Sequence, residues 1–94
     1  MDFLKLIDGY KNDIIKSTQD IIKIRSVEGE KKDNMPFGEG PCKALDFALN
    51  LADKLGFKTK NLDNYAGHAE YGEGNEIVGV LVHLDVVPEG DGWT

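Results

Sequence analysis

The amino-acid sequence predicts an α/β fold in which two helices precede about three strands. In the first half of the chain, apolar residues recur every three to four positions, as they do on one face of a helix. The second half holds two short alternating segments and one unbroken apolar run, which are typical of strands. Because amphipathic elements bury their apolar faces against one another, we expect the helices to cover one face of the sheet.

The first helix is predicted from Phe3 to Ile24. Its apolar residues are separated by charged ones and form one buried face: Phe3, Ile7, Tyr10, Ile14, Ile21 and Ile22. Gly9 weakens this helix locally, by about 1 kcal/mol relative to alanine. The stretch "SVEGEKKDNMPFGEGP", residues 26–41, carries glycine, proline and alternating charge without periodicity, so a surface loop is expected there.

The second helix is predicted to begin at Pro41 and to stop at Gly56, because proline suits a first helical position and glycine a helix end. Its apolar stripe consists of Ala44, Leu45, Ala48, Leu49, Ala52 and Leu55. "GEGP" at 38–41 lacks the lysine and the serine or threonine of a phosphate-binding loop, so a helix-start turn is the favoured interpretation.

Three strands are predicted after the second helix. "FKTKNL" at 57–62 alternates and ends at the turn pair Asp63 and Asn64. "YAGHAEY" at 65–71 alternates again, and an acidic, glycine-bearing connection leads to the run that starts at Ile77. We therefore expect a hairpin that pairs about 65–71 with 77–83 and has a solvated tip. Residues 77–82 are apolar without alternation, which suits a strand covered on both faces.

Composition limits the class of protein. A chain of 94 residues forms one domain at most. Eleven basic and seventeen acidic residues give a net charge of -6, which repels phosphate backbones and anionic lipids, so neither nucleic acid nor membrane is expected as a partner. The first residues, "MDFLKLIDGYKNDII", are interrupted by charge and resemble neither a signal peptide nor a transmembrane helix, and a cytoplasmic location is expected.

Two reactive residue types have a structural and a functional interpretation. Cys42 is the only cysteine, which excludes an internal disulfide and a cysteine-clustered zinc site. Its thiolate could be stabilised by the start of the second helix, but a small buried hydrophobe is the favoured interpretation. His68 could be imagined as a metal ligand, and a solvent-facing strand histidine is favoured instead.

His83 and Asp85 are the candidate site residues. They lie two positions apart where the apolar run ends, so in an extended chain both side chains point to the same side. Imidazole is a common zinc ligand, and its second ring N–H usually donates to a carboxylate, so Asp85 could orient His83 or bind metal directly. This pattern is short, and on these three residues alone the favoured interpretation is structural, with His83 closing the strand and Asp85 accepting turn hydrogen bonds.

The residues that follow add a family resemblance. "HLDVVPEGDGW" at 83–93 resembles the signature of the zinc-dependent aminoacylase, carboxypeptidase and dipeptidase family, in its bacterial carnosinase-like or Xaa-His dipeptidase branch. The likeness extends to "GEGPCKALDFALNLADKLGF" at 38–57 and "NYAGHAEYG" at 64–72, and so covers essentially the whole chain.

The resemblance implies that residues 1–94 are the N-terminal part of a metallopeptidase catalytic domain built on a mixed sheet. It implies that His83 binds zinc, that Asp85 contacts and positions His83, and that residues 88–93 form a structural turn. Two zinc ions are implied for the complete enzyme, with the other ligands and the general base beyond Thr94, so this chain alone is expected to be inactive. The implied substrate is a dipeptide with a free N-terminus.

Two alternatives remain open. One is a desuccinylase or deacetylase of the same family, which acts on N-acyl amino acids. The other is a stand-alone domain without catalysis, serving binding or assembly. An exposed apolar face at 77–83 would count against the second alternative, because a self-sufficient domain should cover that segment.

Overall fold

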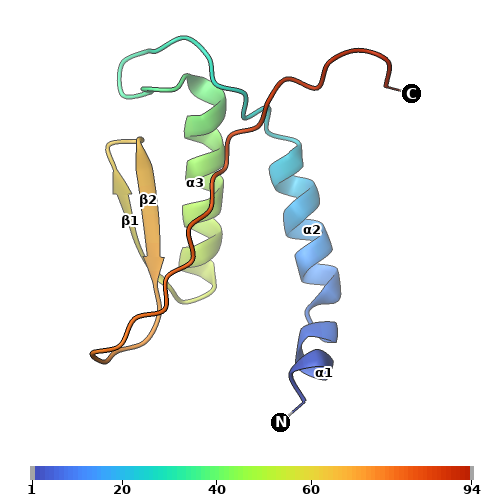
Figure 1. Ribbon diagram of the computed structural model, residues 1–94, viewed down its shortest axis with the longest axis vertical. Coiled ribbons are helices and arrows are strands. Elements are labelled where there is room, and N and C mark those ends of the chain that lie inside the picture. Colours follow the sequence, from blue (N-terminus) through green and yellow to red (C-terminus); the bar gives the residue numbers. More distant parts are fainter. Residues whose placement is uncertain (1, 94) are drawn as a thin grey trace.

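The computed structural model describes residues 2–93 and contains three helices and one two-stranded sheet (Figure 1). In chain order, the elements are α1 (Phe3–Asp8), α2 (Lys11–Ile22), α3 (Glu39–Lys54), β1 (Lys58–Leu62) and β2 (Ala66–Glu70). The α/β class is confirmed, with one more helix and one fewer strand than the sequence predicted.

The predicted first helix is divided into α1 and α2. Asp2 caps α1, since its Oδ1 accepts from the backbone N–H groups of Leu4 and Lys5. The division falls at Gly9 and Tyr10, and Tyr10 has φ -100° and ψ 4°, outside the helical region. The helix therefore breaks beside Gly9, the residue that was expected to weaken it. No described side chain of α1 is buried, so no tertiary packing offsets the low helix propensity of this glycine.

Helix α3 matches its prediction closely at both ends. It begins two residues before Pro41, after Gly38 with φ 91°, and the proline lies in the first turn, where its missing N–H costs nothing. At the other end Gly56 has φ 94° and Phe57 donates to the carbonyl of Ala52. A left-handed glycine just after the last turn, followed by an N–H that bonds to a carbonyl within that turn, is the usual way in which a helix ends at glycine. The helix-start interpretation of 38–41 is confirmed.

Strands β1 and β2 form an antiparallel hairpin with pairs from Lys58↔Glu70 to Leu62↔Ala66. The turn residues Asp63 and Asn64 both have positive φ, at 54° and 62°, which is the tight hairpin turn that matches strand twist. Helix α3 packs against both strands. A Cβ on Gly67 of β2 would meet the Leu49 side chain at 3.0 Å, so the strand lies directly on the helix.

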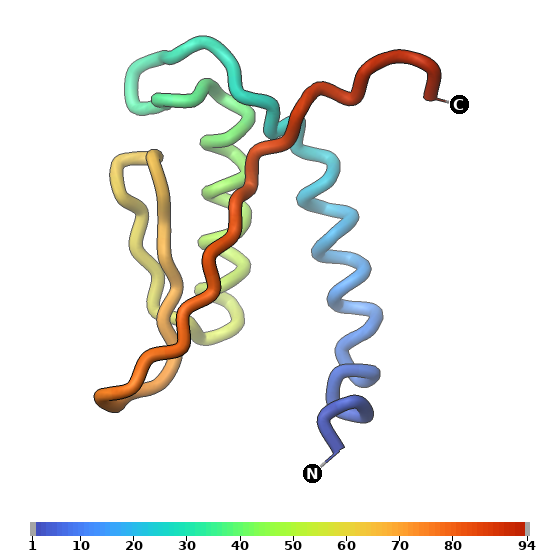
Figure 2. The backbone as a smooth tube through the Cα atoms, in the orientation of Figure 1, coloured from blue at the N-terminus to red at the C-terminus, as the bar shows by residue number. Residues whose placement is uncertain are grey.

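The predicted hairpin between 65–71 and 77–83 is wrong. Strand β2 pairs with β1, and no sheet of the described residues includes Ile77–Val82. The three residues between Leu62 and Ala66 hold β1 and β2 in register, whereas the longer acidic connection at 72–76 sets no register. That connection is exposed as predicted, but it is not a hairpin tip. Figure 2 shows the chain turning back after β2 and continuing as an open trace to the C-terminal end.

The apolar run that was expected to be covered is exposed instead. Ile77 is 90% exposed, Val78 94% and Leu81 99%. The described core is correspondingly small, with Cys42 and Ala44 as its buried apolar residues. None of the helices formed within 2–93 is long and apolar enough to cross a membrane.

Candidate functional site

His83 and Asp85 contact one another, as the two-residue spacing predicted. Nδ1 of His83 lies 3.1 Å from Oδ1 of Asp85 and 2.9 Å from the backbone oxygen of the same residue. Both oxygens only accept hydrogen bonds, so Nδ1 must be the atom that carries the proton in the neutral ring. Nε2 then presents a lone pair, which is the form of imidazole that binds metal.

The pair is open to its surroundings. The side chains of His83 and Asp85 are 83% and 57% exposed, so protein atoms leave Nε2 accessible. The two residues do not lie on a strand of the described sheet, contrary to the expected setting, and their contact is local to the chain after the apolar run. Their roles in metal binding and catalysis stay predictions.

The chain after Asp85 forms the glycine-containing turn that was expected to be structural. Gly90 and Gly92 have φ 72° and 89°, in the left-handed region that favours glycine. The indole Nε1 of Trp93 donates to the backbone carbonyl of Glu89 and closes this turn. These observations explain the two glycines and the tryptophan of "PEGDGW" without assigning them a chemical role.

The described residues provide one candidate zinc ligand, His83, rather than a complete zinc site. Between residues 2 and 93, no group of three or more histidine, cysteine, aspartate or glutamate side chains is arranged to hold a metal ion. A catalytic zinc uses about three protein ligands. The donor chemistry of His83, with Asp85 on its other ring nitrogen, therefore suits a single imidazole contribution to a larger ligand set.

Both other reactive residues have the structural role that was favoured. Cys42 is 8% exposed, and burial, followed by the nearby Asp46 carboxylate, raises the pKa of its thiol. This direction is opposite to that of an activated thiolate and, with the burial of Cys42, favours the structural interpretation. His68 lies in β2 opposite Lys60 and is exposed, as expected for a solvent-facing strand histidine.

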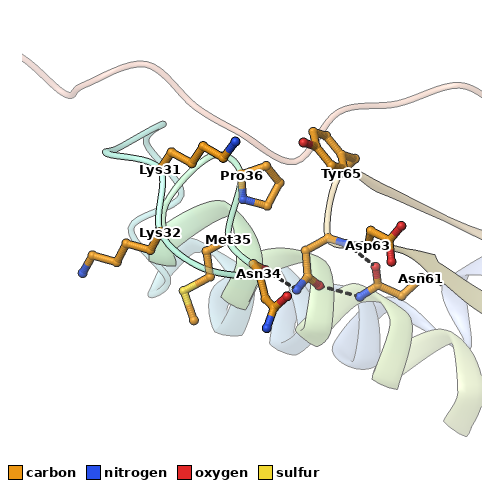
Figure 3. A pocket seen from close by; sticks show the side chains of 9 residues that line it. Lys31, Lys32, Asn34, Met35, Pro36, Asn61, Asp63 and Tyr65 are labelled. Atoms are coloured by element: carbon orange, nitrogen blue, oxygen red, sulfur yellow. Dashed lines mark hydrogen bonds between the residues drawn. The ribbon is translucent and has the colours of Figure 1, made fainter.

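An open polar hollow of about 450 Å³, which no sequence motif predicted, lies between the loop before α3 and the hairpin turn (Figure 3). Asn64 joins these two segments, since its Nδ2 donates to the backbone carbonyl of Asn34 while its Oδ1 accepts from Asn61. Lys32 at the rim is paired with Glu39 at 3.0 Å. The available signal was the residue type, because asparagine tolerates the positive φ that Asn34 and Asn64 adopt.

Comparison with known proteins shows that this chain is similar to proteins named putative dipeptidases. It is 54% identical over 86 residues, 89% of its length, to the protein named "Putative dipeptidase YtjP" of Bacillus subtilis strain 168. It is 42% identical over 89 residues, 93% of its length, to "Putative dipeptidase SAUSA300_1697" of Staphylococcus aureus strain USA300. The chain spans 19% of the length of each of these relatives. No protein-family model matches the chain.

Proposed function

We propose that this chain is part of a zinc-dependent dipeptidase that hydrolyses short peptides with a free N-terminus. In this proposal His83 binds zinc through Nε2 and Asp85 holds the imidazole in place. The observation that supports it most directly is the contact between His83 Nδ1 and the two oxygens of Asp85, because in the neutral ring a proton on Nδ1 leaves a lone pair on Nε2.

Asp85 would act on His83 in two ways. Its carboxylate keeps the proton on Nδ1 and makes Nε2 a stronger electron donor, and it restricts rotation of a ring that is otherwise exposed. Zinc, when bound, would polarise the carbonyl of the scissile peptide bond and activate the attacking water. The remaining ligands and the general base are proposed to come from other parts of a longer protein, so residues 1–94 alone should be inactive.

The names of the relatives support a dipeptide over an acylated amino acid as the substrate. The stand-alone binding domain is disfavoured by a different observation. Residues 77–82 are apolar and exposed, with Ile77, Val78 and Leu81 at least 90% accessible, and a self-sufficient domain would cover such a run.

The test is substrate choice by the protein expressed from the complete reading frame. An unblocked dipeptide, an N-succinyl amino acid and an N-acetyl amino acid are offered in parallel, with and without a chelator. Cleavage of the dipeptide alone, lost with the chelator and restored by zinc, is the expected result. Preference for an acylated substrate would move the protein to the desuccinylase or deacetylase class, and chelator-resistant cleavage would refute the zinc proposal.

A further inference from the structure

The segment that carries His83 and Asp85 is fastened to the rest of the structure at few points. Among residues 2–93, one backbone hydrogen bond and one ion pair join residues 77–93 to earlier parts of the chain. The backbone N–H of Val86 donates to the carbonyl of Ser26 at 3.2 Å, beside a parallel bridge between Val27 and Val86. Nη1 of Arg25 lies 2.6 Å from Oε2 of Glu89.

Both attachments use residues 25–27, and this short segment lies in close contact with the start of α3. A Cβ on Gly40, in the first turn of α3, would lie 2.0 Å from the carbonyl oxygen of Arg25 and 3.3 Å from the Cα of Ser26. Ser26 is 4% exposed. The backbone of residues 25–27 is therefore packed on the start of α3 and can serve as a fixed support.

We propose that Arg25 and Glu89 are positioning residues that hold the His83–Asp85 turn against this support. Glu89 lies four residues after Asp85, in the turn that Trp93 closes, so its ion pair with Arg25 limits the movement of the turn as a whole. The inference rests on the proposed function of His83. Arg25 lies 64 positions before Glu89 in the sequence, so the turn is held by a residue from a distant segment of the chain.

The exposure of Arg25 and Glu89 allows their positioning role to be distinguished from a contribution to the stability of the fold. The side chains of Arg25 and Glu89 are 63% and 61% exposed, and exposed ion pairs contribute little to the stability of a fold. Loss of the pair should therefore leave the unfolding temperature nearly unchanged. Its effect should appear at His83, whose segment loses one of its two polar attachments.

The test uses Arg25→Gln, Glu89→Gln and the charge swap Arg25→Glu with Glu89→Arg. In the complete protein, each single variant should lower kcat for a dipeptide by about threefold to tenfold, less than the roughly 10–100-fold typical of a residue that contacts a metal ligand, because Arg25 and Glu89 act on His83 through the turn rather than directly. KM and the unfolding temperature should stay close to wild type, and the swap should restore most of kcat. Lys16→Gln, which breaks the 2.5 Å Lys16–Asp20 pair within α2, is the matched control and should have no effect.

A second readout needs no catalysis. In the chain of residues 1–94, the ¹H–¹⁵N heteronuclear NOE values of the His83 and Asp85 backbone amides report how far this turn moves; they should fall in each single variant and recover in the swap. Unchanged NOE values and unchanged kcat, or losses that follow the unfolding temperature and that the swap does not restore, would overturn the positioning role. If the wild-type protein cleaves no dipeptide, the proposed function fails alone, and the NOE values still decide whether Arg25 and Glu89 hold the turn that carries His83.

Discussion

Replacing Gly40 with alanine should destabilise the protein, although alanine is the better helix former. The new Cβ would lie 2.0 Å from the carbonyl oxygen of Arg25, whereas real Cβ atoms essentially never approach another heavy atom within 3.0 Å. Either α3 or the Arg25–Ser26 backbone must therefore move by about 1 Å, and because the clash is with a backbone atom, the overpacking should cost about 2–3 kcal/mol, the upper part of the usual range. The helix preference of alanine offsets about 0.5–1 kcal/mol of this, so the net loss should be roughly 1–2 kcal/mol.

Urea unfolding of the chain, followed by circular dichroism, measures this loss. With a slope of about 1 kcal/mol/M for a protein of this size, the midpoint should fall by about 1–2 M. Gly29→Ala is the matched control, because a Cβ there meets nothing within 4 Å, and its midpoint should stay near that of wild type. A Gly40→Ala midpoint equal to or above the wild-type value would show that the Arg25 carbonyl does not pack on α3.

Three further predictions concern the buried thiol, the exposed run and the site carboxylate. Alkylation of Cys42 by iodoacetamide at pH 8 should be slower in the folded chain than in urea, because burial restricts access to the thiol and raises its pKa, and equal rates would contradict the packing. The chain should associate with rising concentration through residues 77–82, and Leu81→Lys should reduce this in sedimentation measurements; a wild type that stays monomeric would contradict it. In the complete protein, Asp85→Ala should lower activity by about 10–100-fold while most zinc is retained, whereas Asp91→Ala in the same turn should not; unchanged activity in Asp85→Ala would refute the orienting role.

The features of the fold that depend on near neighbours in the sequence were predictable. The end of α3 at Gly56 and the turn at Asp63 and Asn64 follow from residues that tolerate positive φ, and both are present. The partner of β2 was not predictable in the same way. Residues 58–62 and 77–83 both offered a possible strand, and the choice depended on turn length and on which segment α3 could cover.

The candidate site shows the same distinction between local and distant contacts. The contact of His83 with Asp85 spans two residues, and the chain geometry predicts it. The Arg25–Glu89 pair and the packing of Gly40 on Arg25 join segments far apart in the sequence. No local pattern in the loop at 26–41 or in the turn after Asp85 indicates that they meet, so only the three-dimensional arrangement could reveal the support for His83.

The measurement that bears most directly on the proposed function is the zinc content and dipeptidase activity of His83→Ala in the complete protein. His68→Ala is the matched control, since His68 is the only other histidine of the chain and is exposed in β2. His83→Ala should lose bound zinc and all detectable cleavage of an unblocked dipeptide, while His68→Ala keeps both. Full zinc content and activity in His83→Ala would contradict the assignment of His83 as a zinc ligand.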